Sequence, residues 1–425
     1  MAIIKIKNQA IDLDAAEIPN LPATKITSGT FDNARISLDA AEIPNLDTAK
    51  ITTGTLADAR LPANALNSNV SVPNQSAFKN IIINGDMSIA QRGTSVSGID
   101  GTESGYKTVD RMFTEISNAG AWTQSLSTTV PTAQGFAKSL KMDCTTADST
   151  PTFLSVETHF EGQNLQYLKK GTSSAKSTTL SFWVKSNKTG TYICGLRDLD
   201  NDRAISKSYT ISSADTWEKK TLTYAGDTSG DLGNDNGKSL GVTFFLAVSS
   251  TYSSGTLATS WGSRTNANRA VGQVNLADST SNEWYITGVQ LEAGTTASDF
   301  EFLPVDVNLE RCLRNCFVVG NTPTNGERNR YANVGTYYTA TQFFSNVYYP
   351  VVMRATPSFT AVGSNTAQAF TIYSANAGKT STAVGRDAIS ATNIGYVITT
   401  ASATQGDGGL GAWNLGYYGI IEAEL

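Results

Sequence analysis

A 25-residue repeat near the N-terminus constrains this chain more than any other feature. The run from Leu13 to Arg35 returns almost unchanged at Leu38 to Arg60, and each copy carries a proline and a glycine at fixed offsets, Pro19 and Gly29 in the first. Large apolar residues recur mostly every five positions, which fits neither an amphipathic helix nor an alternating strand. Proline fixes φ and glycine allows positive φ, so each repeat is expected to consist of short extended pieces broken by turns.

The repeats carry too few large apolar residues to bury a core within one chain, and solitary repeats need neighbours to cover their faces. The simplest neighbours are other copies, and a threefold rotation leaves no open edge. We therefore predict a homotrimeric shaft with a core formed by Ile18, Leu21, Ile26, Ile43, Leu46 and Ile51. The alternative is a disordered tether, although such segments usually contain fewer branched apolar residues.

Composition excludes several classes of function. The 425 residues include 32 Lys and Arg against 37 Asp and Glu, and the basic residues are dispersed, so no nucleic-acid footprint is expected. Neither a signal-like N-terminal region nor an apolar run long enough to cross a membrane is present, which predicts synthesis and retention in the same compartment. Four cysteines in so long a chain do not form a disulfide framework.

The chain divides into six predicted segments. Residues 1–12 are an anchor, 13–66 the repeat shaft and 67–79 a linker rich in polar residues and proline. Residues 80–304 form a β-sandwich, 305–317 a connector helix and 318–425 a distal β domain. Thr, Ser, Gly and Asn are abundant and only 16% of residues are charged, which favours strands and turns. The predicted fold class is therefore all-β.

The sandwich is predicted from strand-like runs separated by polar turns. In the run 178–185, Leu180, Phe182 and Val184 alternate with polar or larger residues and indicate one buried face. Asn84-Gly85-Asp86 is a turn signal between two expected strands at 81–83 and 87–91. The other expected strands are 121–125, 138–142, 153–160, 190–196, 218–224, 241–248 and 283–291. This number of strands over some 220 residues indicates a two-sheet antiparallel jelly roll.

Several runs also carry a family resemblance. The runs Asn80–Gly93, Thr108–Arg111, Ser181–Ser186, Asp215–Glu218, Trp284–Gly294, Phe300–Phe302 and Leu309–Cys312 resemble, in the same order, a domain of bacteriophage tail fibre and receptor-binding proteins. The similarity covers about residues 80–317, and Met112-Phe113 departs from it where the family usually has a tryptophan. That family is similar to carbohydrate-binding modules of the jelly-roll class, so the resemblance implies a sandwich on a phage appendage without identifying its ligand.

The clearest helix is predicted from Val305 to Phe317. Its apolar stripe consists of Leu309, Cys312, Leu313 and Cys316, with Arg311 and Arg314 off the stripe and Asp306 or Asn308 as the N-cap. Cys312 and Cys316 are interpreted as small apolar residues of this face rather than a redox or metal pair. The distal domain is expected to contain strands at 333–339, 341–347, 350–353, 359–362, 370–373, 395–400 and 413–424, the last of them inside a sheet.

No motif selects a catalytic or metal site. His159, the single histidine, is expected to be a structural strand residue, because no second imidazole or thiol lies near it in sequence. Asp198, Asp200 and Asp202 alternate as in a calcium loop, but the glycine and glutamate of an EF-hand are missing, so a turn is expected. A structural Ca²⁺ stays open as an alternative. No pair of carboxylates is singled out for glycan hydrolysis.

Recognition is the remaining chemistry, since aromatic rings suit the apolar faces of sugars. The candidate receptor contacts, all in the distal domain, are Tyr337, Tyr338, Trp413, Tyr417 and Tyr418; the alternative is that most fill its core or the trimer seam.

The expected protein is a non-enzymatic, homotrimeric tailed-phage fibre, made in the host cytoplasm and carried on the virion. It docks on a tail or head adaptor and binds a bacterial surface glycan or protein. A capsid fibre and a glycan-degrading tailspike are the alternatives.

Overall fold

The computed structural model describes residues 78–101, 104–322, 326–328, 333–375 and 377–425. The predicted anchor, the repeat shaft with its six core residues and nearly all of the linker lie outside the described residues. Within the described residues the chain is almost entirely β, as predicted, and its two α-helices are α1 (Ser250–Ser253) and α2 (Val305–Leu313). Neither helix is long and apolar enough to cross a membrane.

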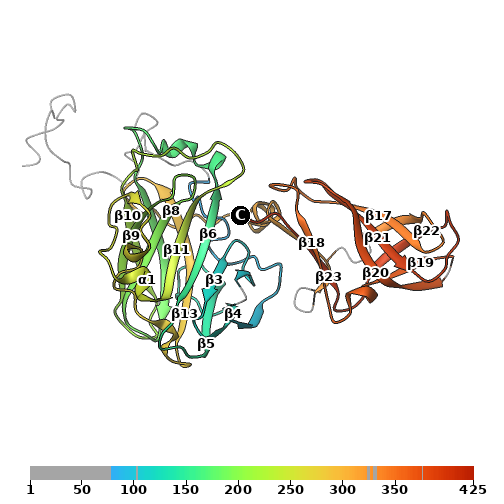
Figure 1. Ribbon diagram of the computed structural model, residues 1–425, viewed down its shortest axis with the longest axis horizontal. Coiled ribbons are helices and arrows are strands. Elements are labelled where there is room, and N and C mark those ends of the chain that lie inside the picture. Colours follow the sequence, from blue (N-terminus) through green and yellow to red (C-terminus); the bar gives the residue numbers. More distant parts are fainter. Residues whose placement is uncertain (1–77, 102–103, 323–325, 329–332, 376) are drawn as a thin grey trace, which may run out of the picture. The chain divides into compact units, whose positions relative to one another are not determined.

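The sandwich consists of two antiparallel sheets, drawn from blue to yellow in Figure 1. The first has six strands in the order β1 (Ser95–Ile99), β4 (Ala121–Ser127), β5 (Ser139–Thr146), β13 (Glu283–Ala293), β7 (Thr178–Ser186) and β10 (Glu218–Tyr224). The second has seven in the order β12 (Gly262–Ser263), β9 (Arg203–Ile211), β8 (Gly190–Asp198), β11 (Lys238–Val248), β6 (Phe153–Glu161), β3 (Phe113–Ser117) and β2 (Gly105–Tyr106). Four short 3₁₀ turns lie in the connections, η7 (Gly162–Asn164), η8 (Gln166–Leu168), η9 (Asn266–Asn268) and η10 (Leu276–Asp278).

The core lies between the two sheets and follows the period-two pattern of the sequence. Leu180, Phe182 and Val184 of β7 are fully buried in it, which confirms the face predicted from their alternation. β6 departs from this pattern because all nine of its residues are buried. Leu154, Val156 and Phe160 enter the core, while the opposite face carries buried polar groups, among them Glu157 and His159. That polar face of β6 leads into the candidate site.

The run from Asn80 to Gln91 forms turns rather than the two predicted strands. Asn84 has a positive φ of 61°, and its amide group donates to the carbonyls of Ile89 (2.9 Å) and Asp110 (2.9 Å). The same side chain accepts the N–H of Ile89 (2.9 Å). These side-chain bonds take the place of the ladder bonds that a strand would make. The prediction rested on the isoleucine run, whose composition is that of a strand and does not reveal the bonds of Asn84.

Helix α2 is shorter than predicted, because it ends at Leu313 and the chain enters strand β14 at Cys316. Its N-cap is Pro304, which has no side-chain capping bond, so the prediction of Asp306 or Asn308 as the cap is wrong. Asn308 instead accepts the N–H of Asn84 (3.2 Å) and donates to Asp86 (3.1 Å). The turn-forming run therefore binds the helix and positions its other side chains.

The C-terminal unit contains a four-stranded sheet and a small closed barrel, coloured orange to red in Figure 1. The sheet order is β15 (Gly326–Arg328), β14 (Cys316–Thr322), β23 (Tyr418–Glu422) and β18 (Ser358–Val362). The barrel runs through β16 (Asn333–Tyr337), β17 (Gln342–Tyr348), β21 (Asn393–Thr400), β20 (Ala377–Ile389), β19 (Phe370–Ser374) and β22 (Gly408–Trp413), and η11 (Thr366–Gln368) precedes β19. The last strand, β23, pairs on both sides, as expected.

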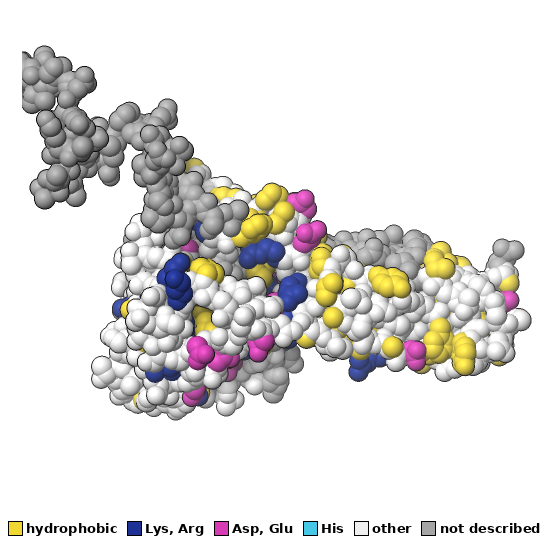
Figure 2. Space-filling model, turned by 90° about the horizontal axis from the view of Figure 1, so that it is seen from above, with side chains coloured by type: hydrophobic (Ala, Val, Ile, Leu, Met, Phe, Trp, Pro, Cys, Tyr) yellow, Lys and Arg dark blue, Asp and Glu magenta, His cyan; other side chains and the backbone are white. Residues whose placement is uncertain are grey.

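Two predictions for this unit are wrong, and one long strand was missed. Residues 350–353 are not a strand, and the expected strand at 413–424 is interrupted by a turn between β22 and β23. The thirteen residues of β20 were not predicted, because their few apolar side chains do not alternate clearly. On the face drawn in Figure 2, neutral polar side chains and backbone cover most of the surface, in keeping with the low content of charged residues.

Candidate functional site

A pocket of about 500 Å³ lies where five segments distant in sequence meet. Its lining comes from the segment that precedes the sandwich, the turn before β3, the end of β6 with the turns η7 and η8, helix α2 with its C-cap, and the last residue of the chain. Its principal lining residues are Phe78, Asn80, Arg111, His159, Glu161, Gln163, Asn164, Tyr167, Arg311, Arg314 and Leu425. The volume falls within the roughly 300–1,000 Å³ of small-molecule sites.

The entry segment is held by a carboxylate and by strand β13. The N–H groups of Phe78 (2.7 Å) and Asn80 (2.9 Å) donate to the two oxygens of Glu301. The side-chain amide of Asn80 donates to the carbonyl of Val289 (3.1 Å), and its oxygen accepts the N–H of Leu291 (3.1 Å). These bonds fix the backbone that presents Phe78, a residue that is 55% exposed.

Arg314 reaches from α2 to the end of β6 and forms a two-pronged ion pair with Glu161. Its Nε and Nη2 donate to the two carboxylate oxygens at 2.9 and 2.7 Å, and Gln163 Nε2 donates to one of them at 2.7 Å. Burial raises the pKa of Glu161, but the bonds and charge of Arg314 outweigh burial and leave this pKa below its usual value. The charge of Arg314 is therefore neutralised within the site.

Arg111 is also neutralised. Its Nη2 donates to the backbone carbonyl of His159 (2.6 Å), and its Nη1 forms an ion pair with Glu424. Arg92 joins the same carboxylate at 3.0 Å and also pairs with Glu422 at 2.8 Å. Burial lowers the pKa of Arg111, yet the nearby Glu424 charge raises it above the ordinary value, so the guanidinium stays protonated.

Arg311 differs from the other two arginines because no carboxylate among the described residues binds it. Its Nη2 makes one long bond to the carbonyl of Asn80 (3.4 Å), and its Nη1 is buried without a hydrogen-bond partner among the described residues. Its guanidinium carbon lies 5.8 Å from the centre of the Phe78 ring. Burial lowers the pKa of Arg311 and the Arg111 charge adds to this effect, while the charge of Glu301 opposes it. Among the described residues, Arg311 is therefore the arginine of the pocket without a directly bound carboxylate.

His159 lies in β6, as predicted, with its ring buried against Glu157 (Nε2 to Oε2, 3.1 Å). Burial lowers the pKa of His159 more than Glu157 raises it, so the ring is neutral at pH 7. On the same polar face, burial and the Glu157 charge raise the pKa of Glu115.

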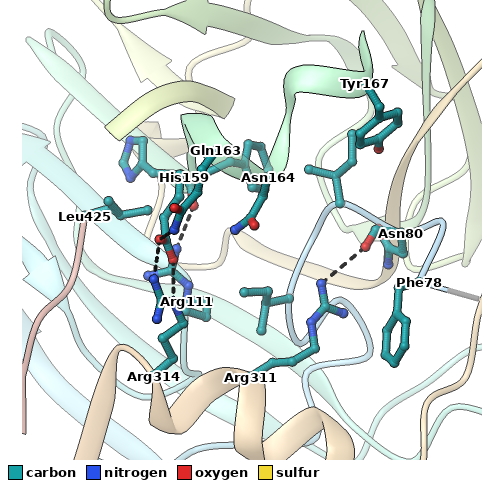
Figure 3. Close-up of a pocket in the computed structure, with 14 residues that line it drawn as sticks. Phe78, Asn80, Arg111, His159, Gln163, Asn164, Tyr167, Arg311, Arg314 and Leu425 are labelled. Carbon is teal, nitrogen blue, oxygen red and sulfur yellow. Dashed lines mark hydrogen bonds and ion pairs between the residues drawn. The ribbon is translucent and has the colours of Figure 1, made fainter. Parts of the chain in front are cut away.

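The pocket walls combine aromatic and polar groups. Figure 3 shows Phe78 and Tyr167 on one side with Asn80 between them, and Arg111 and Arg314 on the other. Tyr167 is 43% exposed, and Lys176 lies 5.7 Å from its ring centre. Aromatic rings with adjacent amide and guanidinium donors can bind a sugar ring, since the rings cover its apolar face and the donors bind its oxygens.

The predicted receptor contacts of the distal unit fall into three groups by exposure. Tyr337 and Trp413 are fully buried in the core of the C-terminal unit, as expected for a packing role, and Tyr417 and Tyr418 are half-buried. Tyr338 is 67% exposed. These five residues do not line the pocket described above. The predicted shaft core lies outside the described residues.

The aspartates of the 198–202 run are bound by protein groups. Asp198 pairs with Lys170, Asp200 accepts the N–H of Gly233 (2.9 Å), and Asp202 pairs with Arg264 (2.5 Å). Within the described residues no group of three or more potential metal ligands gathers. The residues after Asp198 form a turn, as predicted.

Sequence reasoning did not find the pocket, because its residues come from segments far apart in the chain. One signal was present: Arg311 and Arg314 lie off the apolar stripe of the predicted helix. Nothing in the sequence indicated that β6 and the entry segment would face them.

No protein-family model and no curated protein sequence matches this chain. Similar solved structures include the enzymatically active domain of tailspike protein 4 from bacteriophage CBA120, at 13% identity and a TM-score of 0.29 over 51% of this chain and 22% of that one. The xylan-binding domain from carbohydrate-binding module family 22 matches at 13% identity and a TM-score of 0.26, over 48% of this chain and 98% of that domain. A family 11 module from Clostridium thermocellum, solved with a mixed-linked tetrasaccharide, matches at 11% identity and 0.24, over 50% and 95%. With TM-scores this low, the fold assignment depends on the sheet topology alone.

Proposed function

We propose that this chain is a non-enzymatic, homotrimeric fibre protein of a tailed-phage virion whose sandwich binds a bacterial surface glycan. The observation that carries the binding proposal is the pocket: it has the volume of a small-ligand site, and aromatic rings lie near guanidinium and amide donors. The resemblance of residues 80–317 to phage fibre domains supports the virion location. The N-terminal repeats support a trimer that docks on a tail or head adaptor.

Three linked copies make a weak sugar site useful. Each pocket is small and partly open to solvent at Phe78 and Tyr167, so the affinity of one copy is expected to be modest. Simultaneous binding of three copies to one cell surface can raise apparent affinity by roughly 10² to 10⁴. The proposed glycan site therefore needs the proposed trimer to reach a useful apparent affinity for the cell surface.

An array of bacterial surface polysaccharides, probed with the full chain, tests this function. We expect binding to at least one polysaccharide, weakened by Phe78→Ala and by Tyr167→Ala. Tyr373→Ala is the matched control, because Tyr373 is an exposed aromatic residue outside the pocket lining. The bound polysaccharide is expected to keep its length on incubation.

Three results would each overturn part of the proposal. If no polysaccharide binds, glycan recognition is wrong. If binding survives both pocket variants but is lost in Tyr338→Ala, the receptor site lies in the distal unit instead. Release of shortened oligosaccharides would show an enzyme.

A further inference from the structure

The charge balance of the pocket points to a particular class of ligand. Of its three arginines, Arg111 has Glu424 and Arg314 has Glu161 as carboxylate partners. Glu301, whose charge raises the pKa of Arg311, binds the N–H groups of Phe78 and Asn80 with its two oxygens. No carboxylate among the described residues forms an ion pair with Arg311, so its guanidinium is the one in this pocket that can pair with an anionic ligand.

The position of Arg311 suits an anion carried on a sugar. Its guanidinium lies beside the Phe78 ring, and both line the pocket with Tyr167. A saccharide ring placed over these aromatic groups would bring a carboxylate or phosphate substituent close to this guanidinium, whose buried Nη1 has no partner among the described residues. Arginine binds such groups with two parallel bonds, and a bond to a charged group is stronger than one between neutral groups.

We propose that the pocket selects anionic saccharides, with Arg311 binding the carboxylate or phosphate of the ligand. This inference rests on the proposed glycan-binding function and specifies its ligand class. An anion at this position satisfies a half-buried guanidinium whose one hydrogen bond to the described residues is a long bond to a backbone carbonyl. A neutral sugar would leave this donor without a charged partner, so it should bind more weakly.

Titration of the full chain with small probes tests the proposal. The probes are methyl β-D-glucuronide, N-acetylneuraminate and glucose 6-phosphate, with methyl β-D-glucoside as the neutral reference. At least one anionic probe should bind about tenfold more tightly than the glucoside, because a hydrogen bond to a charged group adds that much affinity. The carboxylate and phosphate arms distinguish the two sources of the negative charge.

Substitutions at Arg311 supply the second arm. Arg311→Met should abolish the preference for the anionic probe and reduce its dependence on salt, while Arg311→Lys should retain part of both. Arg386→Met is the matched control, because Arg386 is an exposed arginine of the C-terminal barrel outside the pocket. Thermal melting of each variant verifies that it is folded.

The outcomes separate this inference from the function on which it rests. Equal affinity for the glucoside and the anionic probes, or an anion preference that persists in Arg311→Met, would overturn the anionic ligand while leaving glycan binding in place. Absence of binding by every anionic probe would also overturn it, and the polysaccharide array then decides whether neutral glycans bind.

Discussion

Arg111 and Glu424 form a buried ion pair that joins the start of the sandwich to the penultimate residue of the chain. Their side chains are 2% and 7% exposed. Arg92 shares Glu424, and the side chain of Gln91 donates to Asp110 (2.6 Å) and to the carbonyl of Cys316 (2.7 Å). The runs that carry the family resemblance therefore tie the sandwich to the strand that follows α2 and to the C-terminus.

Removal of Arg111 should be strongly destabilising. Arg111→Met leaves the carbonyl of His159 without this donor and Glu424 with only Arg92, so we expect a loss of about 3 kcal/mol in the free energy of unfolding. Adding Glu424→Gln should recover part of this loss, because it removes the buried charge. Urea unfolding of both single variants and the double variant measures the coupling.

The control for this cycle is an exposed pair. Arg264→Met, which breaks the pair with the 57%-exposed Asp202, should cost less than about 1 kcal/mol. Additive effects of Arg111→Met and Glu424→Gln within about 0.5 kcal/mol would contradict the proposed coupling.

The pair of Arg314 and Glu161 predicts a pH-dependent stability. A carboxyl whose pKa is lower in the folded than in the unfolded chain stabilises the fold above the unfolded pKa, and this effect is lost as pH falls through the folded pKa. The pKa of Glu161 is lowered from 4.5 in the fold. Arg314→Met should therefore melt below wild type at pH 7, and the difference should narrow as pH is lowered from about 5 to 3. A difference in Tm that stays constant over this range would contradict the assignment.

The run Trp284–Gly294 contains Gly288, a position at which the structure requires glycine. This run is nearly all of β13, and Gly288 has φ of 62° at a bulge between Thr287 and Gln290. A Cβ there would lie 2.5 Å from Phe136 Cζ. Gly288→Ala should lower the free energy of unfolding by about 2 kcal/mol, from the left-handed backbone and the contact together.

Gly262→Ala is the control for Gly288→Ala in the same urea titration. Gly262 lies in the edge strand β12 with ordinary backbone and open space around its Cα, so its substitution should change stability by less than about 0.5 kcal/mol. Equal effects of the two alanine substitutions would show that the bulge does not require glycine.

The predicted shaft implies a definite mass in solution. We expect the full chain to sediment at three times its 45.1 kDa mass, because the repeats need neighbouring copies to bury their apolar residues. The double variant Ile18→Asp/Leu21→Asp should shift the population towards single chains. A well-folded monomer of the unsubstituted chain at micromolar concentration would contradict the trimer.

The features that could be predicted from the sequence are those that depend on local periodicity, namely strands and their buried faces. Alternation in β7 identified its buried face, and eight of the expected sandwich strands are present with small shifts of their ends. The prediction failed where hydrogen bonds of a side chain determine the backbone conformation, as those of Asn84 do in the 80–91 run. It also missed β9, whose residues between Arg203 and Ile211 include several polar side chains on a buried strand.

The candidate site was less predictable than the fold. Arg311 and Arg314 could be recognised as polar exceptions on a helix, but their different roles depend on which one reaches Glu161. Which arginine pairs with Glu161 depends on the position of the end of β6, some 150 residues earlier in the chain. The pocket is a consequence of tertiary contacts that no local pattern encodes.

Calorimetric titration with a fragment of the polysaccharide that binds most tightly on the array tests whether the pocket is the glycan site. The titration compares the full chain with its Tyr167→Ala and Tyr373→Ala variants. We expect Tyr167→Ala to weaken binding by about 1 kcal/mol, roughly fivefold in Kd, through loss of the ring from the pocket wall, while Tyr373→Ala binds as wild type. Unchanged affinity of Tyr167→Ala, combined with unchanged affinity of Phe78→Ala, would contradict the assignment of the pocket as the glycan site.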